Sequence, residues 1–218
     1  MKISFLNKYL QLAQPIRLLL EYAGADYKDV QYACGPAPKF DLSPWLDVKN
    51  TLGLDYPNLP YLIDGHIKIT QSNAILRYLG RKFDLDGKAE EDRVQVDIML
   101  DNAMDFRNGF VGLCYNPDFA TLKKEYLAKL DVTLKKFSDH LGNRSFFAAN
   151  YVTYPDFHMY EMLDSHHLLA PEVVNKYANL VAFIERFEKL PKIGAFLKTA
   201  KGSRPMNNKM AKFGQAKL

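Results

Sequence analysis

The chain has 218 residues, of which 48% are hydrophobic and 25% charged, a balance typical of globular proteins. The formal net charge of +4 is too small to indicate nucleic-acid binding by itself. The two cysteines, Cys34 and Cys114, lack the spacing of a disulfide scaffold or a zinc site. No apolar run is as long as a membrane span, which needs about 18 residues. The apolar run at the N-terminus is too short for a signal peptide. We therefore expect a cytoplasmic protein that acts neither on nucleic acid nor in a membrane.

The N-terminal part of the chain alternates between strand and helix patterns. Residues 2–6 (KISFL) alternate weakly between apolar and polar and predict a strand. Residues 14–24 (QPIRLLLEYAG) carry apolar side chains at helical spacing, with Pro15 in the first turn and Gly24 placed to end the helix. Residues 27–33 (YKDVQYA) are rich in Tyr and Val and predict a second strand. This order of elements is typical of an α/β domain.

A loop, a hairpin and a helix are predicted next. Residues 34–44 (CGPAPKFDLSP) form a loop by their prolines and glycine. Residues 60–69 (PYLIDGHIKI) hold two short alternating runs around Asp64 and Gly65, a dipeptide preferred in two-residue hairpin turns. Residues 70–82 open with Thr, Gln and Ser, which favours the start of another helix.

The remainder of the chain shows helical patterns and no convincing strand. Residues 83–92 are a polar link. Residues 122–142 repeat apolar side chains three or four positions apart and predict an amphipathic helix. Residues 151–170 and 179–200 show the same pattern. The tail, residues 200–218, has five basic residues and no acidic one, and we expect it to be irregular and partly exposed.

Several stretches taken together resemble one known family. The segments PNLPYLIDG (57–65) and KITQSNAILRYL (68–79), with AQPIRLLLEY (13–22) upstream, resemble the glutathione-binding domain of a glutathione S-transferase. LCYNPDF (113–119) and the loop GPAPKFDLSPWL (35–46) are similar to the mu class in particular. The resemblance extends over essentially the whole chain and is far more specific than a single motif.

The resemblance implies a fold and an assembly. It implies a thioredoxin-like α/β domain over residues 1–82, a linker over 83–89 and an all-α domain over 90–218, which is the glutathione transferase fold. It also implies a homodimer. Tyr56 matches an aromatic residue that family members insert into a pocket of the other subunit, and we expect Arg77 at the same interface.

The resemblance further implies a site for glutathione, a small anionic tripeptide with a thiol, as substrate or ligand and without a metal. Gln71 and Ser72 lie at a helix start, where free N–H groups and the dipole favour the γ-glutamyl carboxylate. Leu59, before a cis Pro60, matches the position that pairs its backbone with the peptide of the ligand. The other implied contacts are Trp45, Lys49, Asn58 and, from the partner subunit, Asp105.

Each of these residues also has a purely structural interpretation. Ser72 alone could open a helix, Trp45 could be a core aromatic residue, and Lys49 could be a solvated surface charge. Their occurrence together at the family spacing favours the glutathione site.

The chain departs from the family at the reactive end of this site. Counting back from Pro15, the position of the family's catalytic tyrosine holds Leu6, and the following tryptophan position holds Asn7. The family's arginine before Trp45 corresponds to Leu42. A tyrosine hydroxyl that donates to sulfur stabilises the thiolate, and leucine has no donor. We therefore expect binding to survive better than catalysis.

Two tyrosines are candidates for the missing donor. Tyr9 lies three residues beyond the vacant position, where a shifted loop could aim its hydroxyl at the sulfur. Tyr115, in LCYNPDF, matches a family tyrosine that assists from the side of the electrophile. For both residues, plain packing is the alternative interpretation.

The leading hypothesis is a mu-like glutathione S-transferase, a detoxification enzyme in that family, with weak or altered activity toward small hydrophobic electrophiles. One alternative is a non-catalytic protein that binds glutathione or apolar ligands. The other is a structural or antigenic dimer that keeps only the fold.

Overall fold

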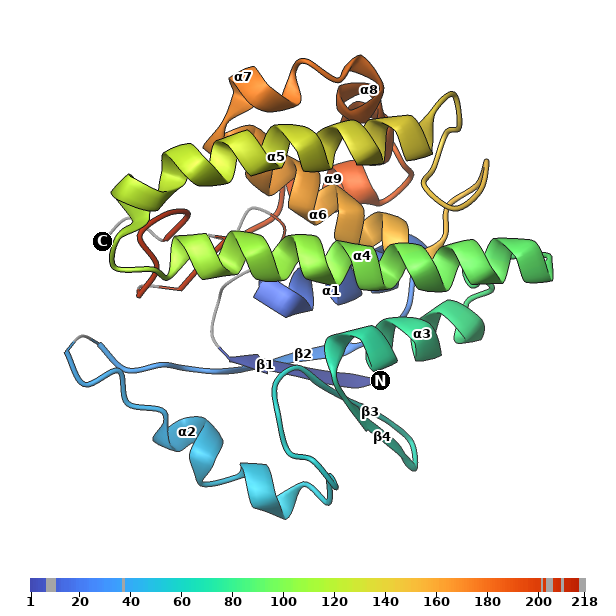
Figure 1. Ribbon diagram of the computed structural model, residues 1–218. Helices are drawn as coiled ribbons and strands as arrows, with labels where there is room; N and C mark the ends of the chain where they lie inside the picture. Colours follow the sequence, from blue (N-terminus) through green and yellow to red (C-terminus); the bar gives the residue numbers. More distant parts are fainter. Residues whose placement is uncertain (7–10, 37, 201, 203–205, 209, 216–218) are drawn as a thin grey trace.

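The computed structural model describes residues 1–6, 11–36, 38–200, 202, 206–208 and 210–215, with the backbone alone for 2–6 and 11 (Figure 1). The N-terminal part follows the order strand, helix, strand, hairpin, helix. Its strands are β1 (Lys2–Leu6), β2 (Lys28–Tyr32), β3 (Tyr61–Asp64) and β4 (Ile67–Thr70). Its helices are η1 (Gln11–Ala13), α1 (Gln14–Ala23), α2 (Ser43–Leu46), η2 (Lys49–Thr51) and α3 (Ser72–Lys82).

The four strands form one mixed sheet in the order β2-β1-β3-β4. β1 pairs in parallel with β2, so that Leu6 lies opposite Tyr32. On its other side β1 pairs antiparallel with β3, where Ser4 lies opposite Tyr61. The β3–β4 hairpin turns at Gly65, whose φ of 62° is readily adopted by glycine.

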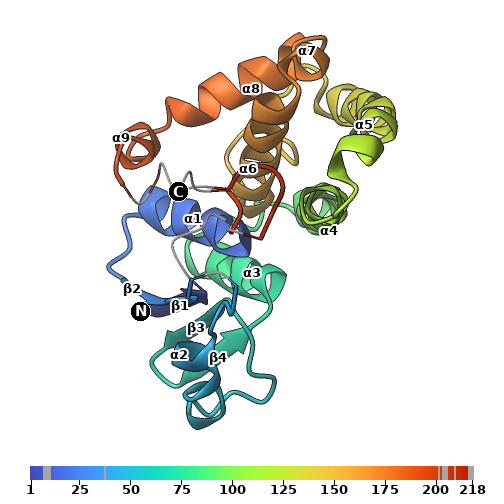
Figure 2. The ribbon, with the colours of Figure 1, turned by 90° about the vertical axis from the view of Figure 1, so that its left-hand side faces the viewer.

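The C-terminal part consists of helices in the described residues. They are α4 (Glu90–Cys114), α5 (Phe119–Leu141), α6 (Tyr154–Leu169), α7 (Pro171–Val174), α8 (Ala178–Glu188) and α9 (Ile193–Leu197). Figure 2 shows α1 and α3 on one face of the sheet, with the remaining long helices stacked beyond them. The short α2 lies on the opposite side of the sheet, away from this helical layer.

The structure confirms the predicted strands, the hairpin and the two helices of the N-terminal part. The prediction of a single helix over residues 179–200 is wrong, because the helix is interrupted between α8 and α9. Pro191 lies at this break, and Lys192 has a φ of 69°, which ends regular helix. The tail is irregular as expected. It is also partly exposed, as expected, because Met206, Asn207 and Ala211 are buried whereas Met210 is exposed.

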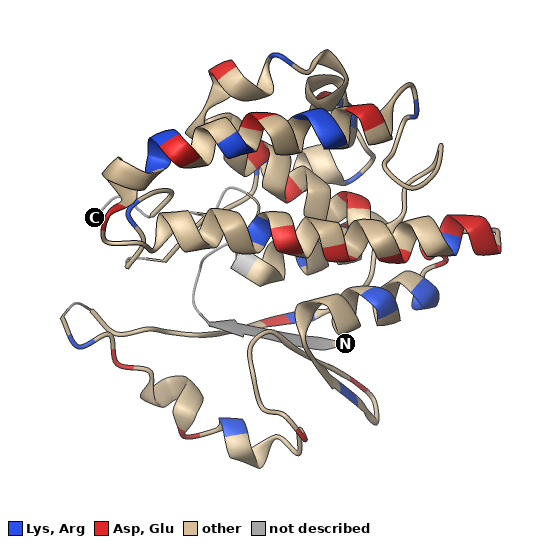
Figure 3. Cartoon of the chain, in the orientation of Figure 1, with Lys and Arg blue, Asp and Glu red and all other residues tan. Residues whose placement is uncertain are grey.

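Charged residues of both signs are interspersed along α4 and α5 (Figure 3). No helix in the described part of the chain is long and apolar enough to cross a membrane.

Helix α6 passes through the core and carries a buried carboxyl group, that of Glu161. Its Oε2 has no hydrogen-bond partner within the described part of the chain. Burial raises the pKa of Glu161 to about 8, against the charge of Arg107, which lowers it, while Asp164 raises it further. The folded protein therefore favours the neutral acid at this position.

This carboxyl makes stability depend on pH. Because its folded-state pKa lies above the value of 4.5 in the free side chain, the folded state binds the extra proton between these limits. The free energy of unfolding therefore falls as pH rises through that window. We expect Glu161→Gln to gain stability relative to the wild type between about pH 5.5 and about pH 7.5 in urea unfolding. Glu185→Gln, which alters an exposed carboxylate, is the control and should follow the wild-type profile. A constant difference between Glu161→Gln and wild type across this range contradicts the assignment.

Candidate functional site

The start of α3 is an open helix N-terminus. Gln71 precedes the helix with φ 71° and ψ 115°, an unusual backbone conformation for a residue other than glycine. No side chain of the described residues caps this end, and Ser72 is buried in the first position. The first N–H groups of a helix have no partner within the helix, and they carry its positive dipole end. This end of α3 is therefore suited to a carboxylate.

A second backbone element lies beside it. The peptide bond between Leu59 and Pro60 is cis and leads directly into β3. Because Tyr61 pairs with Thr70 across the hairpin, Leu59 and Pro60 lie next to the start of α3. The exposed Asn58 accepts the N–H of Leu59 through its own Oδ1 at 2.9 Å. A ligand that uses this N–H must therefore displace the Asn58 side chain.

Trp45 supplies a flat aromatic wall on α2. The residue is 7% exposed, and its indole N–H has no hydrogen-bond partner within the part of the chain that the structure describes. Buried tryptophan N–H groups usually have one, so this donor is available to a bound molecule. Lys49, half-buried, opens η2 one turn further along the chain. Leu42, also half-buried, precedes α2 and brings no charge.

These elements together provide a helix end for one carboxylate, an edge of backbone, an indole donor and an ammonium group. Such a set can hold a short anionic peptide in an extended conformation. In the described residues no group of three or more His, Cys, Asp or Glu side chains is arranged to bind a metal.

Tyr115 lies at the C-terminal end of α4, and its hydroxyl accepts the N–H of Asn208 at 3.1 Å. The N–H of Lys212 also reaches α4, at the carbonyl of Cys114. The ring of Phe213 stacks on Phe119 at 6.2 Å. These contacts hold Asn208, Lys212 and Phe213 against the C-terminal end of α4, so this part of the tail lies beside Tyr115.

Asp105 lies elsewhere, on the exposed side of α4. It borders a groove between α4 and α5 with a volume of 440 Å³. Phe106 and Phe137 provide aromatic lining, and Lys129 and Lys136 also line the groove. Asp105 is therefore exposed at the edge of a partly aromatic groove and does not lie among the residues at the start of α3.

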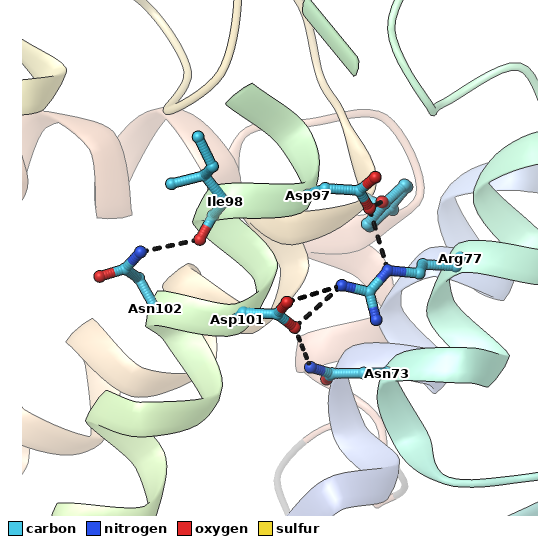
Figure 4. Close-up of polar contacts among 7 residues, drawn as sticks. Asn73, Arg77, Asp97, Ile98, Asp101 and Asn102 are labelled. Carbon is cyan, nitrogen blue, oxygen red and sulfur yellow. Dashed lines mark hydrogen bonds and ion pairs between the residues drawn. The ribbon is translucent and has the colours of Figure 1, made fainter. Parts of the chain in front are cut away.

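Arg77 joins α3 to α4 (Figure 4). Its Nη2 contacts both carboxylate oxygens of Asp101 at 2.9 Å, and its Nε contacts Asp97 at 2.9 Å. Asn73 donates to Asp101 from the first turn of α3 at 3.0 Å. These contacts fix the start of α3 relative to α4.

Of the three positions that depart from the family pattern, Leu6, Asn7 and Leu42, only Leu42 is described with its side chain. Asn7 and Tyr9 are outside them, and for Leu6 only the backbone, at the end of β1, is described. Leu42 precedes α2, and Tyr115, the other candidate donor, lies at the end of α4.

Sequence analysis missed two residues behind the candidate site, Tyr32 and Tyr61. Both rings contact Trp45, and their hydroxyl groups are 2.9 Å apart. Each is an ordinary strand tyrosine in the sequence. Only the strand order brings them together, so no local pattern could have indicated the pair.

Comparisons with known proteins agree with the fold. Residues 6–81 match the glutathione S-transferase N-terminal domain, and residues 104–200 match the glutathione S-transferase C-terminal domain. Glutathione S-transferase Mu 5 of Rattus norvegicus is 49% identical over 95% of this chain and 92% of its own. Glutathione S-transferase Mu 3 of Homo sapiens is 48% identical over 93% of this chain and 91% of its own. The crystal structure of the glutathione S-transferase Blo t 8 superposes with a TM-score of 0.89 at 27% identity, covering 98% of this chain and 100% of that one.

The chain belongs to the mu class of the glutathione S-transferase family. The predicted family and its fold, a thioredoxin-like part with an all-α part, are thus confirmed. Membership supports glutathione conjugation at the level of the family.

The contact between Tyr115 and the tail gives a direct prediction. Tyr115→Phe removes the acceptor of the Asn208 N–H, so we expect this amide to exchange with solvent about fivefold faster. Hydrogen exchange followed by mass spectrometry or NMR measures it. Tyr177→Phe, which loses a hydroxyl bonded to the carbonyl of Asp131, is the matched control. If exchange at Asn208 is unchanged in Tyr115→Phe as it is in the control, the Tyr115 hydroxyl does not hold the tail.

Proposed function

We propose that this protein binds glutathione in the site at the start of α3 and conjugates it only slowly to hydrophobic electrophiles. The observation that carries the proposal is the sequence position at the end of β1, where the family has its catalytic tyrosine and this chain has Leu6. A thiol with a pKa near about 8.5 is mostly protonated at neutral pH, and the thiolate is the nucleophile. Loss of one positioned donor to an anion costs on the order of 10²–10³ in rate.

The residues around the site receive specific roles in this proposal. The N–H groups at Gln71 and Ser72 bind the γ-glutamyl carboxylate, supported by the uncapped end of α3. The backbone of Leu59, before Pro60, pairs with the cysteinyl residue of glutathione. For this the Asn58 carboxamide releases the Leu59 N–H and turns to the ligand.

The glycyl end of glutathione is assigned to α2 and η2. Lys49 provides charge for the glycyl carboxylate, and the free indole N–H of Trp45 donates to it. Leu42 cannot make the charge-assisted hydrogen bond that arginine offers, which is worth roughly 1.5–3 kcal/mol. We therefore expect weaker affinity for glutathione than in relatives that keep the arginine.

We also propose a homodimer that completes the site. Tyr56 is 79% exposed, which is unusual for a large aromatic side chain, and it lies between η2 and the cis proline. The groove between α4 and α5 offers Phe106 and Phe137 to its ring, and Asn102 to its hydroxyl. Arg77 and its carboxylate partners lie near this groove, and Asp105 borders it, so Asp105 is assigned to the glutamyl ammonium of the partner's ligand.

Two measurements on one preparation distinguish the functional classes. Calorimetry reports glutathione binding, and turnover of an electrophilic nitroarene reports conjugation. Binding with slow turnover supports the proposal. Binding without any turnover indicates a non-catalytic carrier of glutathione or apolar ligands, and the absence of both signals indicates a structural or antigenic dimer.

Restoring the donor tests the catalytic part. We expect Leu6→Tyr to raise kcat for the nitroarene by on the order of 10², because the hydroxyl can stabilise the thiolate. Leu6→Phe, with the same ring and no hydroxyl, is the matched control and should not gain activity. Brisk wild-type turnover that is lost in Tyr9→Phe contradicts the proposal and assigns the donor to Tyr9.

Removing the exposed aromatic residue tests the assembly. We expect Tyr56→Ala to raise the dimer dissociation constant by at least about thirtyfold, the effect of losing a buried aromatic anchor worth about 2 kcal/mol. Sedimentation equilibrium measures this constant. Leu168→Ala, at another exposed apolar side chain, is the control. An unchanged constant in Tyr56→Ala excludes this residue from the interface.

A further inference from the structure

Two tyrosine hydroxyl groups meet across the central strand of the sheet. Tyr32 ends β2 and Tyr61 begins β3, and β1 lies between these strands. The register places Tyr32 opposite Leu6 and Tyr61 opposite Ser4. The two hydroxyl oxygens are nevertheless only 2.9 Å apart, so their hydrogen bond passes over the end of β1. It ties together both neighbours of the strand that leads to the reactive end of the site.

The ring of Trp45 packs on this pair. Its centroid lies 5.3 Å from that of Tyr32 and 6.0 Å from that of Tyr61, with an interplanar angle of 23° to Tyr61. Tyr61 is fully buried, and Tyr32 is half-buried. Aromatic pairs at such distances stabilise each other beyond the burial of their surface. The orientation of the indole is therefore set by the two tyrosine rings below it.

Trp45 is also the anchor of its own segment. Among the described residues of 33–59, it is the only buried one. Between described residues, the segment has one polar contact with the sheet, an exposed hydrogen bond from Lys68 of β4 to the carbonyl of Leu52 at 2.7 Å. A segment with so little buried surface has low local stability unless a packed residue holds it. The position of α2 and η2 thus depends on how Trp45 sits on the tyrosines.

We propose that the hydrogen-bonded pair of Tyr32 and Tyr61 positions Trp45, and through it segment 33–59, for glutathione. The proposal rests on the proposed function, which assigns Trp45 and Lys49 to the glycyl end of the ligand. The tyrosines do not touch the ligand in this account. Their hydrogen bond fixes the tilt of both rings, and the rings fix the direction of the indole N–H.

Tyr32→Phe is the test variant, because it removes one hydroxyl and keeps the ring against Trp45. Trp45 is the single tryptophan of the chain, so its fluorescence reports on this position alone. We expect Tyr32→Phe to shift the emission of Trp45 and to weaken glutathione binding about threefold to tenfold in calorimetry. Tyr27→Phe is the matched control. It removes a hydroxyl that donates to Glu21 at 2.8 Å, just before the same strand, and should change neither readout.

A double-mutant cycle separates positioning from a general structural effect. If Tyr32 acts through Trp45, then Tyr32→Phe costs no further glutathione affinity in a Trp45→Phe background. Tyr61→Phe removes the same hydrogen bond from the other side and is expected to reproduce the effect of Tyr32→Phe.

Opposite results overturn the proposal. The first is an unchanged emission spectrum and an unchanged glutathione affinity in both Tyr32→Phe and Tyr61→Phe. The second is an equal loss of glutathione affinity from Tyr32→Phe in the wild-type and Trp45→Phe backgrounds. Failure of the proposed function is distinguishable, because wild-type protein then gives no calorimetric signal with glutathione. In that case the emission of Trp45 still decides whether the tyrosine pair positions it.

Discussion

The hydrogen bonds of β1 to both of its neighbours determine where the site can form. β1 is the strand that pairs with β2 on one side and β3 on the other, so its end is fixed relative to both. The β3–β4 hairpin then carries the cis proline and the start of α3 to the same region. Residues far apart in the sequence become parts of one site because a single strand orders them. In the proposed function its final residue, Leu6, takes the place of the donor to the thiol.

Binding and catalysis use separate parts of this arrangement. In the proposed function an open helix end, the backbone of Leu59, an indole and an ammonium group recognise charge and backbone, and none of them needs the reactive end. Activation of a thiol needs one donor at one place. A chain can therefore keep the family's fold and its ligand-binding surface after losing most of its rate. The tyrosine pair under Trp45 belongs to the retained part, since it supports the wall and not the sulfur.

Sequence patterns predicted most of the fold and the family. Gly24, Gly65 and Pro15 mark element boundaries by their own backbone preferences, and these local signals are readable without a structure. The break at Lys192 was missed because the apolar period continues across it. In the site, the helix start and the X–Pro step were visible in the motif. The contacts of Asn58 with Leu59 and of Tyr32 with Tyr61 were not, because they follow from loop conformation and strand order.

The central claim is that no hydroxyl donates to the sulfur of bound glutathione. The most direct measurement is a titration of that thiol in the wild-type complex, followed by the ultraviolet absorbance of the thiolate. The account predicts a pKa close to the value of about 8.5 for an unperturbed thiol. A thiolate that forms well below neutral pH contradicts it, because some other donor must then face the sulfur.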